Sequence, residues 1–448
     1  MNISSKWVDN SKAGLVLAGA TLGLGYNFFR FINRNSVNIL FQDQWDFLTP
    51  LFDDHPKLAE LFLRQHGPPR EGLGLLADRI LYQWTDWNVR SESFAIGGCI
   101  VLAMLLAFWL KIRLFGWLTY ADAAIPLIFL TLGQYETLVG ALNPAYSAIP
   151  LVLMMLYCLT LQQSYGWGRY AWLLLTNLLL IYTGFGLLMG PVTLCVLALE
   201  CYGQLRRPAA GRMIQPFAAF LLAVASLGSF FIHYTPTSAV DCFGLIEETP
   251  TSYFHFVTLM LANFVGARHP LPVATVLGAA ILAGTLAVLA TEIRRLSRSP
   301  LGLNQSVVIA VLATYTLLYA CLTAAARICL GLPEAAWASR YVSLLIPLFL
   351  ALHFYMASLP SSRLLGIAKG IFLMLLIPGC LIPASSSRWF REVKQGWRDC
   401  YLRHEDISYC NQEMGVPIHP DPQRTHLQQK LDYLKQRRLN LFADQAGH

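Results

Sequence analysis

Long runs of apolar residues separated by short polar connections dominate the chain. A helix needs about 20 apolar residues to cross the hydrocarbon core of a bilayer. The stretch 253–267 is too short to span, and we expect it to lie in the interface or to re-enter the membrane. The longer runs predict eleven membrane-spanning helices, at residues 13–32, 94–111, 117–135, 145–163, 170–185, 187–204, 214–233, 271–292, 305–326, 341–358 and 365–384.

The composition agrees with this pattern. Of the 448 residues, 55% are hydrophobic and only 13% are charged, and the mean hydropathy is +0.48. A soluble fold could not bury so much apolar surface. The net charge of +7 does not indicate nucleic-acid binding, because the basic residues form small groups between the apolar runs. We therefore expect an all-α polytopic membrane protein with a transmembrane domain at residues 1–384 and a tail at 385–448.

Lysine and arginine in the short connections predict how the spans are oriented, because they favour the inner side of a membrane. They place the amino terminus inside, and an odd number of spans then places the tail outside. The first apolar run has no cleavage site and is expected to be retained. Two N-x-S/T sequons, at Asn2 and Asn304, fall on the inner side, which favours a bacterial inner membrane. The predicted orientation depends on the basic residues Lys6, Lys12, Lys111, Arg113, Arg169, Arg206, Arg207, Arg212, Arg294, Arg295, Arg298 and Arg363.

The first outer loop, residues 33–93, begins with the sequence FQDQWDF at 41–47. Asp43 and Asp46 are three residues apart, so a helical turn would place both carboxylates on one face, where each raises the proton affinity of the other. Flanking glutamines supply donors and flanking aromatic residues restrict water. This favours a catalytic base near neutral pH. The alternative is a helix cap or a solvated turn at the end of a span.

Two amphipathic stretches around a Pro-Pro break follow in the same loop. Their spacing predicts a helix in the membrane interface, which either covers a cavity open to lipid or only anchors the loop. His66 and Arg70 flank the break, and an arginine offers a planar fork suited to phosphate oxygens. A single histidine in a loop is more often simply exposed. The apolar positions are Leu73, Leu76, Ile80, Trp84 and Trp87, while Asp78, Arg79 and Asp86 face elsewhere.

Two later outer segments carry further candidates. Glu136 lies at the outer end of the third predicted span, close enough to the membrane to line the same cavity, although an ordinary interfacial carboxylate would also fit there. Arg327 and Arg340 flank a short outer loop between the ninth and tenth spans. Arginines on the outer side do not serve the positive-inside bias, so they predict an anion site, and a lipid phosphate is the anion at that depth. The alternative is capture of ordinary phospholipid head groups.

The cysteines indicate no metal site. No CxxC pair or Cys/His spacing predicts a zinc site. Cys400 and Cys410 lie together in the outer tail, where an oxidising compartment would permit a disulfide, although two unpaired packing residues are equally consistent. Six other cysteines lie in or at the edges of apolar runs, where a thiol behaves as a small hydrophobe: Cys99, Cys158, Cys195, Cys201, Cys321 and Cys380.

Four motifs together resemble the GT-C class of integral-membrane glycosyltransferases, which use polyprenyl-phosphate sugars as donors. They are QDQWDF after the first span, QHGPPREGLGLLADRIL in the first outer loop, QYETLVG after the third span and SRYVSLLIP at the start of the tenth. The motifs cover about a tenth of the chain, and the architecture covers all of it. The resemblance implies a transferase of the cell envelope that inverts the anomeric centre and acts in polysaccharide biosynthesis at the outer leaflet, on a glycan or glycolipid acceptor.

The resemblance also implies a role for each candidate residue. Asp43 would be the general base, with Asp46 as the alternative, and Glu136 would support the acceptor. Class members often carry two adjacent acids after the first span, whereas Gln44 stands here. A single phosphate leaving group neutralised by arginine needs no metal, so we expect no cofactor. The substrate-binding candidates are Arg340 and Tyr341 at the leaving phosphate, Arg327 at the same anion site, and His66 with Arg70, which order the loop.

Two other functions remain open from the sequence. An O-antigen polymerase or ligase also meets lipid-linked sugars outside but relies on arginines in a large later loop, and the later loops here are short. A lipid or sugar transporter tends to show internal repeats and ionisable groups near the midplane. The chain shows few such groups beyond Asp122 and Lys369, both near inner ends of predicted spans. The acids of the first loop therefore favour the transferase.

Overall fold

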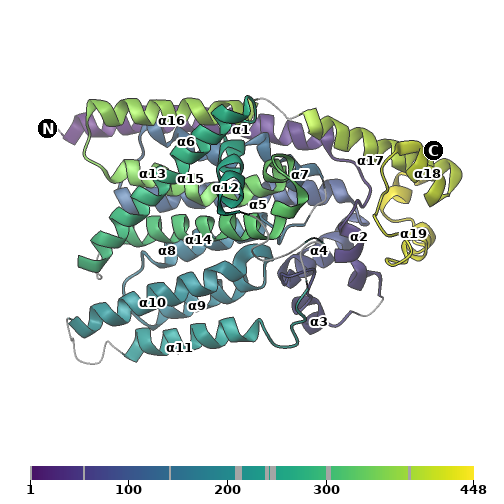
Figure 1. Ribbon diagram of the computed structural model, residues 1–448, viewed down its shortest axis with the longest axis horizontal. Coiled ribbons are helices and arrows are strands. Elements are labelled where there is room, and N and C mark those ends of the chain that lie inside the picture. The colour runs from purple at the N-terminus through teal and green to yellow at the C-terminus, as the bar shows by residue number, and fades with distance from the viewer. Residues whose placement is uncertain are drawn as a thin grey trace.

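The computed structural model describes residues 3–53, 56–140, 143–206, 214–237, 242, 249–298, 304–381 and 385–447. Helices account for the regular structure of these residues, and the described ranges contain no strand. Most of the long helices run along one bundle axis, with the amino terminus at one end and the carboxy-terminal helices at the other (Figure 1). The chain is therefore an all-helical, multi-pass membrane protein, as the sequence predicts.

Seven helical segments among the described residues are long and apolar enough to cross a membrane. They confirm the predicted spans at 13–32, 94–111, 187–204, 271–292, 305–326, 341–358 and 365–384. The segments are built from α1 (Ile3–Asn35), α5 (Val89–Phe115), η4 (Gly184–Leu188) with α10 (Met189–Arg206), α13 (Leu271–Arg298), α14 (Asn304–Arg327) with η5 (Ile328–Leu330), η7 (Ser339–Leu345) with α15 (Ile346–Ser358), and α16 (Arg363–Leu381).

The predicted count of eleven is not confirmed. Three further runs form helices of 13, 15 and 16 residues, α8 (Ala148–Thr160), α9 (Trp167–Ile181) and α11 (Ile214–Ser229). At 1.5 Å per residue each is shorter than the roughly 30 Å hydrocarbon core. The fourth run, 117–135, is interrupted. It forms η2 (Tyr120–Ala123), α6 (Ala124–Phe129) and η3 (Leu132–Gln134).

The interruption in this run has a local cause. Thr131 leaves the helical conformation and caps the next turn, where its hydroxyl accepts a hydrogen bond from the Gly133 N–H at 3.2 Å. The chain then continues into the short helix α7 (Tyr135–Val139). The stretch predicted to lie in the interface or to re-enter forms α12 (Pro250–Phe264), a helix of 15 residues that packs against α13.

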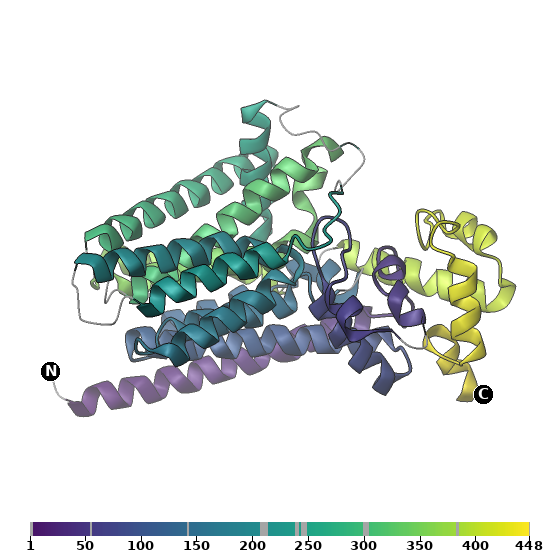
Figure 2. The same ribbon diagram turned by 90° about the horizontal axis from the view of Figure 1, so that it is seen from below.

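The first outer loop forms a layer of short helices at the end of the bundle opposite the amino terminus (Figure 2). On α4, Ile80 and Trp84 are 62% and 84% exposed, whereas Asp78 is buried, so the apolar side of this helix faces away from the protein. This matches a helix in the interface. Trp87 departs from the predicted face, because it is buried and stacks on the Tyr82 ring at 5.2 Å. The helices are α2 (Gln44–Phe47), η1 (Thr49–Phe52), α3 (Leu58–Phe62) and α4 (Gly72–Thr85).

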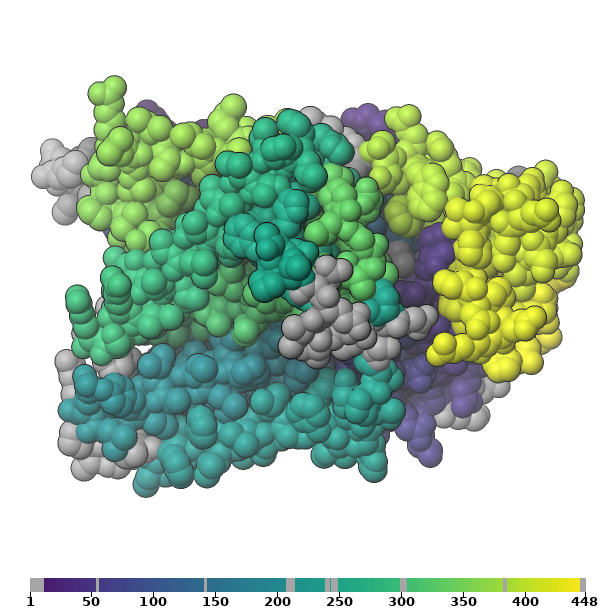
Figure 3. Space-filling view, viewed as in Figure 1, coloured from purple at the N-terminus to yellow at the C-terminus, as the bar shows by residue number. Residues whose placement is uncertain are grey.

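The carboxy-terminal residues fold back onto the first loop and form one end of the molecule (Figure 3). The Gln42 N–H donates to the Ile418 carbonyl at 2.8 Å, and the Asn440 side chain donates to the Trp87 carbonyl at 2.7 Å. These contacts fix the tail against the first loop. Its helices are α17 (Ser385–His404), α18 (Ile407–Met414), α19 (Leu427–Gln436) and η8 (Asn440–Gly447).

Two disulfides connect cysteines of the described residues. Cys400 and Cys410 are bonded, which resolves the alternative left open by the sequence. Cys242 and Cys329 form a second bond, between residues 87 positions apart, that the sequence pattern did not predict. Cys329 belongs to η5, which is followed by the short turn η6 (Glu334–Trp337) before the next span. The six cysteines in or beside apolar runs are free thiols.

Candidate functional site

Asp43 and Asp46 lie on one helical turn directly after the first span. Asp43 is the N-cap residue of α2, and its carbonyl accepts the Asp46 N–H at 3.2 Å. Residues three apart on a helix share a face, as the sequence predicted. The buried Gln44 holds the turn by donating to the Glu92 carboxylate at 3.2 Å. The Asp43 side chain is exposed and that of Asp46 is partly buried.

The Asp46 carboxylate already has a partner from the tail. His419 Nε2 lies 3.1 Å from Asp46 Oδ2, and this hydrogen bond lowers the pKa of Asp46, while burial opposes the change. The expectation that the two carboxylates raise each other's proton affinity is therefore wrong for Asp46. No described residue forms an ion pair or a side-chain hydrogen bond with the Asp43 carboxylate. Asp43 is consequently the carboxylate that remains open to a substrate.

Lys430 of α19 fixes the same turn from the other side. Its ammonium group donates to the Trp45 carbonyl at 2.6 Å and to the Thr49 hydroxyl at 2.8 Å. Burial lowers the pKa of Lys430 to about 8, against the opposing effect of the Asp46 charge. The tail thus supplies two basic groups, His419 and Lys430, that position α2.

His66 lies over the acidic turn. Its ring meets the Phe47 ring edge-on, with centroids 5.9 Å apart. Burial lowers the pKa of His66, while the charges of Asp43 and Asp46 oppose this. The ring therefore favours its neutral form, in which one nitrogen can accept a proton.

Glu71, which the sequence did not single out, is the N-cap residue of α4. Its side chain is buried, with 3% exposed, and burial raises the pKa of Glu71 to about 8. The Asp43 charge raises it further, whereas a hydrogen bond from the Asn143 amide opposes the change. Near neutral pH, Glu71 is therefore mainly protonated.

Arg70 orders the loop rather than facing a pocket. Its Nε donates to the Phe230 carbonyl at 2.8 Å, and its two terminal nitrogens donate to the carbonyls of Leu63 and Ile232. The side chain is 2% exposed. These contacts tie the first loop to the end of α11 and agree with the loop-ordering role that the family resemblance implied, while they leave no free face of the guanidinium for a phosphate.

Glu136 and Arg340 lie together where α7 meets η7. The Glu136 carboxylate accepts the Arg340 backbone N–H at 3.1 Å, and the Glu136 N–H donates to the Ser339 hydroxyl at 3.1 Å. Ser339 in turn donates to the Gly133 carbonyl at 2.6 Å. Two segments about 200 residues apart in the sequence are therefore locked together. The sequence did not predict this contact, and the roles proposed for Glu136 at the acceptor and Arg340 at the phosphate stay predictions.

Arg340, one of the two arginines predicted to bind an anion, lies beside an aromatic ring. Its guanidinium is 5.6 Å from the centre of the buried Tyr341 ring. Arg327 ends α14, and both arginines are partly buried. Their predicted role in binding an anion stays a prediction.

A short segment around Asn143 contacts the first loop. The Asn143 amide donates to Glu71 and its carbonyl oxygen accepts the Ala145 N–H at 2.9 Å, which places Tyr146 one residue further on. A Cβ added at Gly74 would lie 2.5 Å from the Ala145 Cβ, so only glycine permits this approach. α2, α4 and α7 lie at the same end of the bundle (Figure 1). The Asn143 segment is thus tied to the first loop through Glu71.

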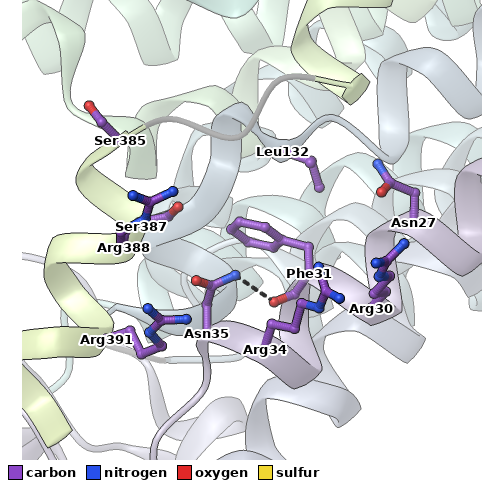
Figure 4. A pocket seen from close by; sticks show the side chains of 10 residues that line it. All are labelled: Asn27, Arg30, Phe31, Arg34, Asn35, Leu132, Ser385, Ser387, Arg388 and Arg391. Carbon is purple, nitrogen blue, oxygen red and sulfur yellow. Dashed lines mark hydrogen bonds between the residues drawn. The ribbon is translucent and has the colours of Figure 1, made fainter.

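A pocket with a volume of about 390 Å³ lies nearby, between the ends of α1 and α17 (Figure 4). Four arginines line it, Arg30, Arg34, Arg388 and Arg391. Leu132 of η3, the turn that leads into α7, also lines it. No three His, Cys, Asp or Glu side chains of the described residues form a group that could hold a metal ion.

No protein-family model matches the chain, and no curated protein matches it. Among solved structures, the chain is similar to ArnT from Cupriavidus metallidurans in the apo state, with 12% identity and a TM-score of 0.43. The match covers 90% of this chain and 70% of the ArnT chain. The same protein bound to undecaprenyl phosphate shares 13% identity at a TM-score of 0.43, with 89% and 73% covered. The Archaeoglobus fulgidus oligosaccharyltransferase shares 11% identity at a TM-score of 0.41, with 91% and 58% covered.

Several residues of the site carried no signal in the sequence. His419 and Lys430 lie in a polar tail more than 370 positions from the acidic turn that they contact. Glu71 stood within a quoted motif, and its burial, which changes its chemistry, depends on tertiary packing. The arginines of the pocket could have been found, because Arg30, Arg34, Arg388 and Arg391 all lie beside predicted outer ends of spans.

Proposed function

We propose that this protein is an inverting membrane glycosyltransferase of the GT-C type. It would move a sugar from a polyprenyl-phosphate donor to a hydroxyl of a lipid-linked or cell-surface glycan, at the outer leaflet of a bacterial inner membrane. The observation that supports the proposal most is the Asp43 carboxylate, which no described side chain pairs, on the helical turn that follows the first span. The contact between Glu136 and the Arg340 N–H supports it further, because it holds an acid and an arginine of two distant segments together.

The proposed step follows from charge. Asp43 accepts the proton of the acceptor hydroxyl while the hydroxyl oxygen attacks the anomeric carbon, a form of base catalysis worth roughly 10² to 10⁴ in rate. The bond between that carbon and the phosphate oxygen breaks, and its electron pair leaves with the phosphate. Arg340 and Arg327 stabilise the departing anion in a site of low polarity. Because phosphate leaves as a stable anion, no second carboxyl acid is needed.

The proposed orientation rests on the two chain ends and on a disulfide. The amino and carboxy termini lie at opposite ends of the bundle (Figure 1). Cys400 and Cys410, bonded in the tail, require an oxidising compartment, which favours a position of that end outside the cytoplasm. This orientation agrees with the positive-inside pattern of the connections.

The deeply buried charges away from the site favour an enzyme over a transporter. Asp122 is paired with Lys111 at 3.4 Å and with His353 at 2.8 Å. Arg169 is paired with Glu200 at 2.5 Å. Such paired groups hold helices together, whereas a transport path needs ionisable groups that face a cavity.

The experiment replaces Asp43 with Asn in the full-length protein and measures sugar transfer in membranes, together with glycan mass spectrometry of cells that carry each variant. D43N should fold and lose transfer by at least about 100-fold, the low end of base catalysis. E60Q removes an exposed carboxylate of the same loop and should keep full activity. Wild-type transfer by folded D43N would refute Asp43 as the base, and unchanged glycans in cells lacking the protein would refute the function.

A further inference from the structure

The pocket between α1 and α17 is built from arginines of two different segments. Arg30 and Arg34 are one helical turn apart near the end of α1, and Arg388 and Arg391 lie in the first turns of α17 (Figure 4). A volume of about 390 Å³ falls in the size range of small-ligand pockets. Asn35 also lines the pocket, and its amide donates to the Phe31 carbonyl at 2.8 Å. The walls are therefore chemically suited to an anion.

The described residues supply little negative charge to these arginines. Arg391 lies 3.8 Å from Glu392, and both side chains are well exposed, so this pair is weak. No described carboxylate is within ion-pair distance of Arg30, Arg34 or Arg388. Four like charges around one cavity repel each other, and a bound anion would relieve that repulsion.

The pocket lies where two outward-facing apolar surfaces end. On α1, Leu22 and Tyr26 are 73% and 69% exposed. Arg30 follows Tyr26 by four residues and therefore lies on the same face of the helix. On α16, Met374 and Leu381 are 68% and 57% exposed. Exposed apolar side chains on spanning helices face lipid, so a molecule in this pocket can extend a chain along them. The ligand is therefore amphipathic.

Each of the two helices that border the pocket is fixed to a neighbouring segment. The Asn27 amide of α1 donates to the Cys380 carbonyl of α16 at 2.9 Å. Lys394 of α17 is buried and donates to the Gly140 carbonyl at 3.0 Å, at the end of α7. These bonds hold the backbones that carry the arginines before a ligand arrives, which reduces the entropy lost on binding.

We propose that this pocket binds the phosphate of an anionic membrane lipid, with its apolar chains along α1 and α16. The site uses arginines other than Arg327 and Arg340 and does not depend on the glycosyltransferase activity proposed above. It is continuous with that site through Leu132, since η3 leads directly into α7 and Glu136. An occupied pocket therefore stabilises the segment that carries Glu136.

The test measures binding of spin-labelled phosphatidylglycerol and phosphatidylcholine to the full-length protein in nanodiscs. Wild type should prefer phosphatidylglycerol. R30Q with R34Q, and separately R388Q with R391Q, should lower that preference by about tenfold or more, since each removes charge-assisted contacts. The matched control is R294Q with R298Q, which removes two exposed arginines at the far end of α13.

The outcomes separate the alternatives. A loss of the preference for phosphatidylglycerol in both pocket variants, but not in the control, supports the site. R30K with R34K, which keeps the charge, should retain most of that preference. Equal binding of both lipids by wild type would overturn the proposal, as would an equal loss in the control. Inorganic phosphate at millimolar concentration should compete only weakly, and complete displacement by phosphate would show a free-anion site instead of a lipid site. The wild-type comparison needs no variant to fold.

Discussion

Replacing Glu71 with Gln should change how stability depends on pH. Glu71 is 3% exposed, and burial raises the pKa of its carboxyl from 4.5 to about 8 in the folded protein. In the unfolded chain the same group ionises near its ordinary value. The folded state therefore binds one more proton than the unfolded state between these two pH values, and wild-type stability falls as pH rises through this window.

The size of the effect follows from the two pKa values. The change from 4.5 to about 8 corresponds to about 5 kcal/mol, at about 1.4 kcal/mol per pH unit. The contribution is fully present below pH 4.5 and is lost by the time the pH passes 8. Glutamine does not titrate, has nearly the same shape as protonated glutamate, and can still accept the hydrogen bond from Asn143. Between pH 5 and pH 8, the free energy of unfolding of E71Q should therefore rise by about 3.5 kcal/mol relative to that of wild type.

The assay is thermal unfolding of the purified protein in detergent at pH 5, 6, 7 and 8. The difference in Tm between E71Q and wild type should widen by roughly 5 °C across this range. E60Q, at an exposed position of the same loop, should differ from wild type by a constant amount. A difference for E71Q that does not change with pH, or that falls as pH rises, would show that Glu71 is not held protonated by burial.

Three further substitutions test other parts of the site. R70A leaves three carbonyls without their donor and should destabilise the protein by roughly 3 to 5 kcal/mol in thermal unfolding, and R70K should recover only part of this because lysine lacks the fork. H419Q removes the group that lowers the pKa of Asp46, so H419Q should be less stable than wild type at neutral pH, and in thermal unfolding this difference should narrow as pH falls through the lowered folded-state pKa of Asp46. R340A should raise the KM for the donor at least about tenfold in a transfer assay, and an unchanged KM would exclude Arg340 from donor binding.

The spans could be predicted because their signal is local. A run such as 271–292 is apolar along most of its length and has its one charged residue at the end, and α13 covers it. The run 117–135 is apolar too, yet Thr131 and Gly133 interrupt it. Hydropathy averages over such a break, so the sequence alone does not reveal that this run is divided.

The site could be predicted only where its residues stand close together in the chain. The helical turn of Asp43 and Asp46 follows from their spacing, whereas the contact between Glu136 and Arg340, about 200 residues apart, does not. The partners that set the charge state do not follow from spacing. His419 reaches Asp46 only because the tail folds back onto the first loop, a contact between distant segments that composition cannot reveal.

These partners give the two aspartates different roles. Asp46 is held as an anion by His419 and contributes to binding the tail, so its charge serves structure. Asp43 has an exposed carboxylate, and the buried Glu71 is mainly protonated at neutral pH. In the proposed step, an incoming hydroxyl would therefore meet Asp43 as the base, because Asp46 is bound by His419 and Glu71 carries no charge. The burial that keeps Glu71 neutral thus limits the negative charge in this part of the protein at neutral pH.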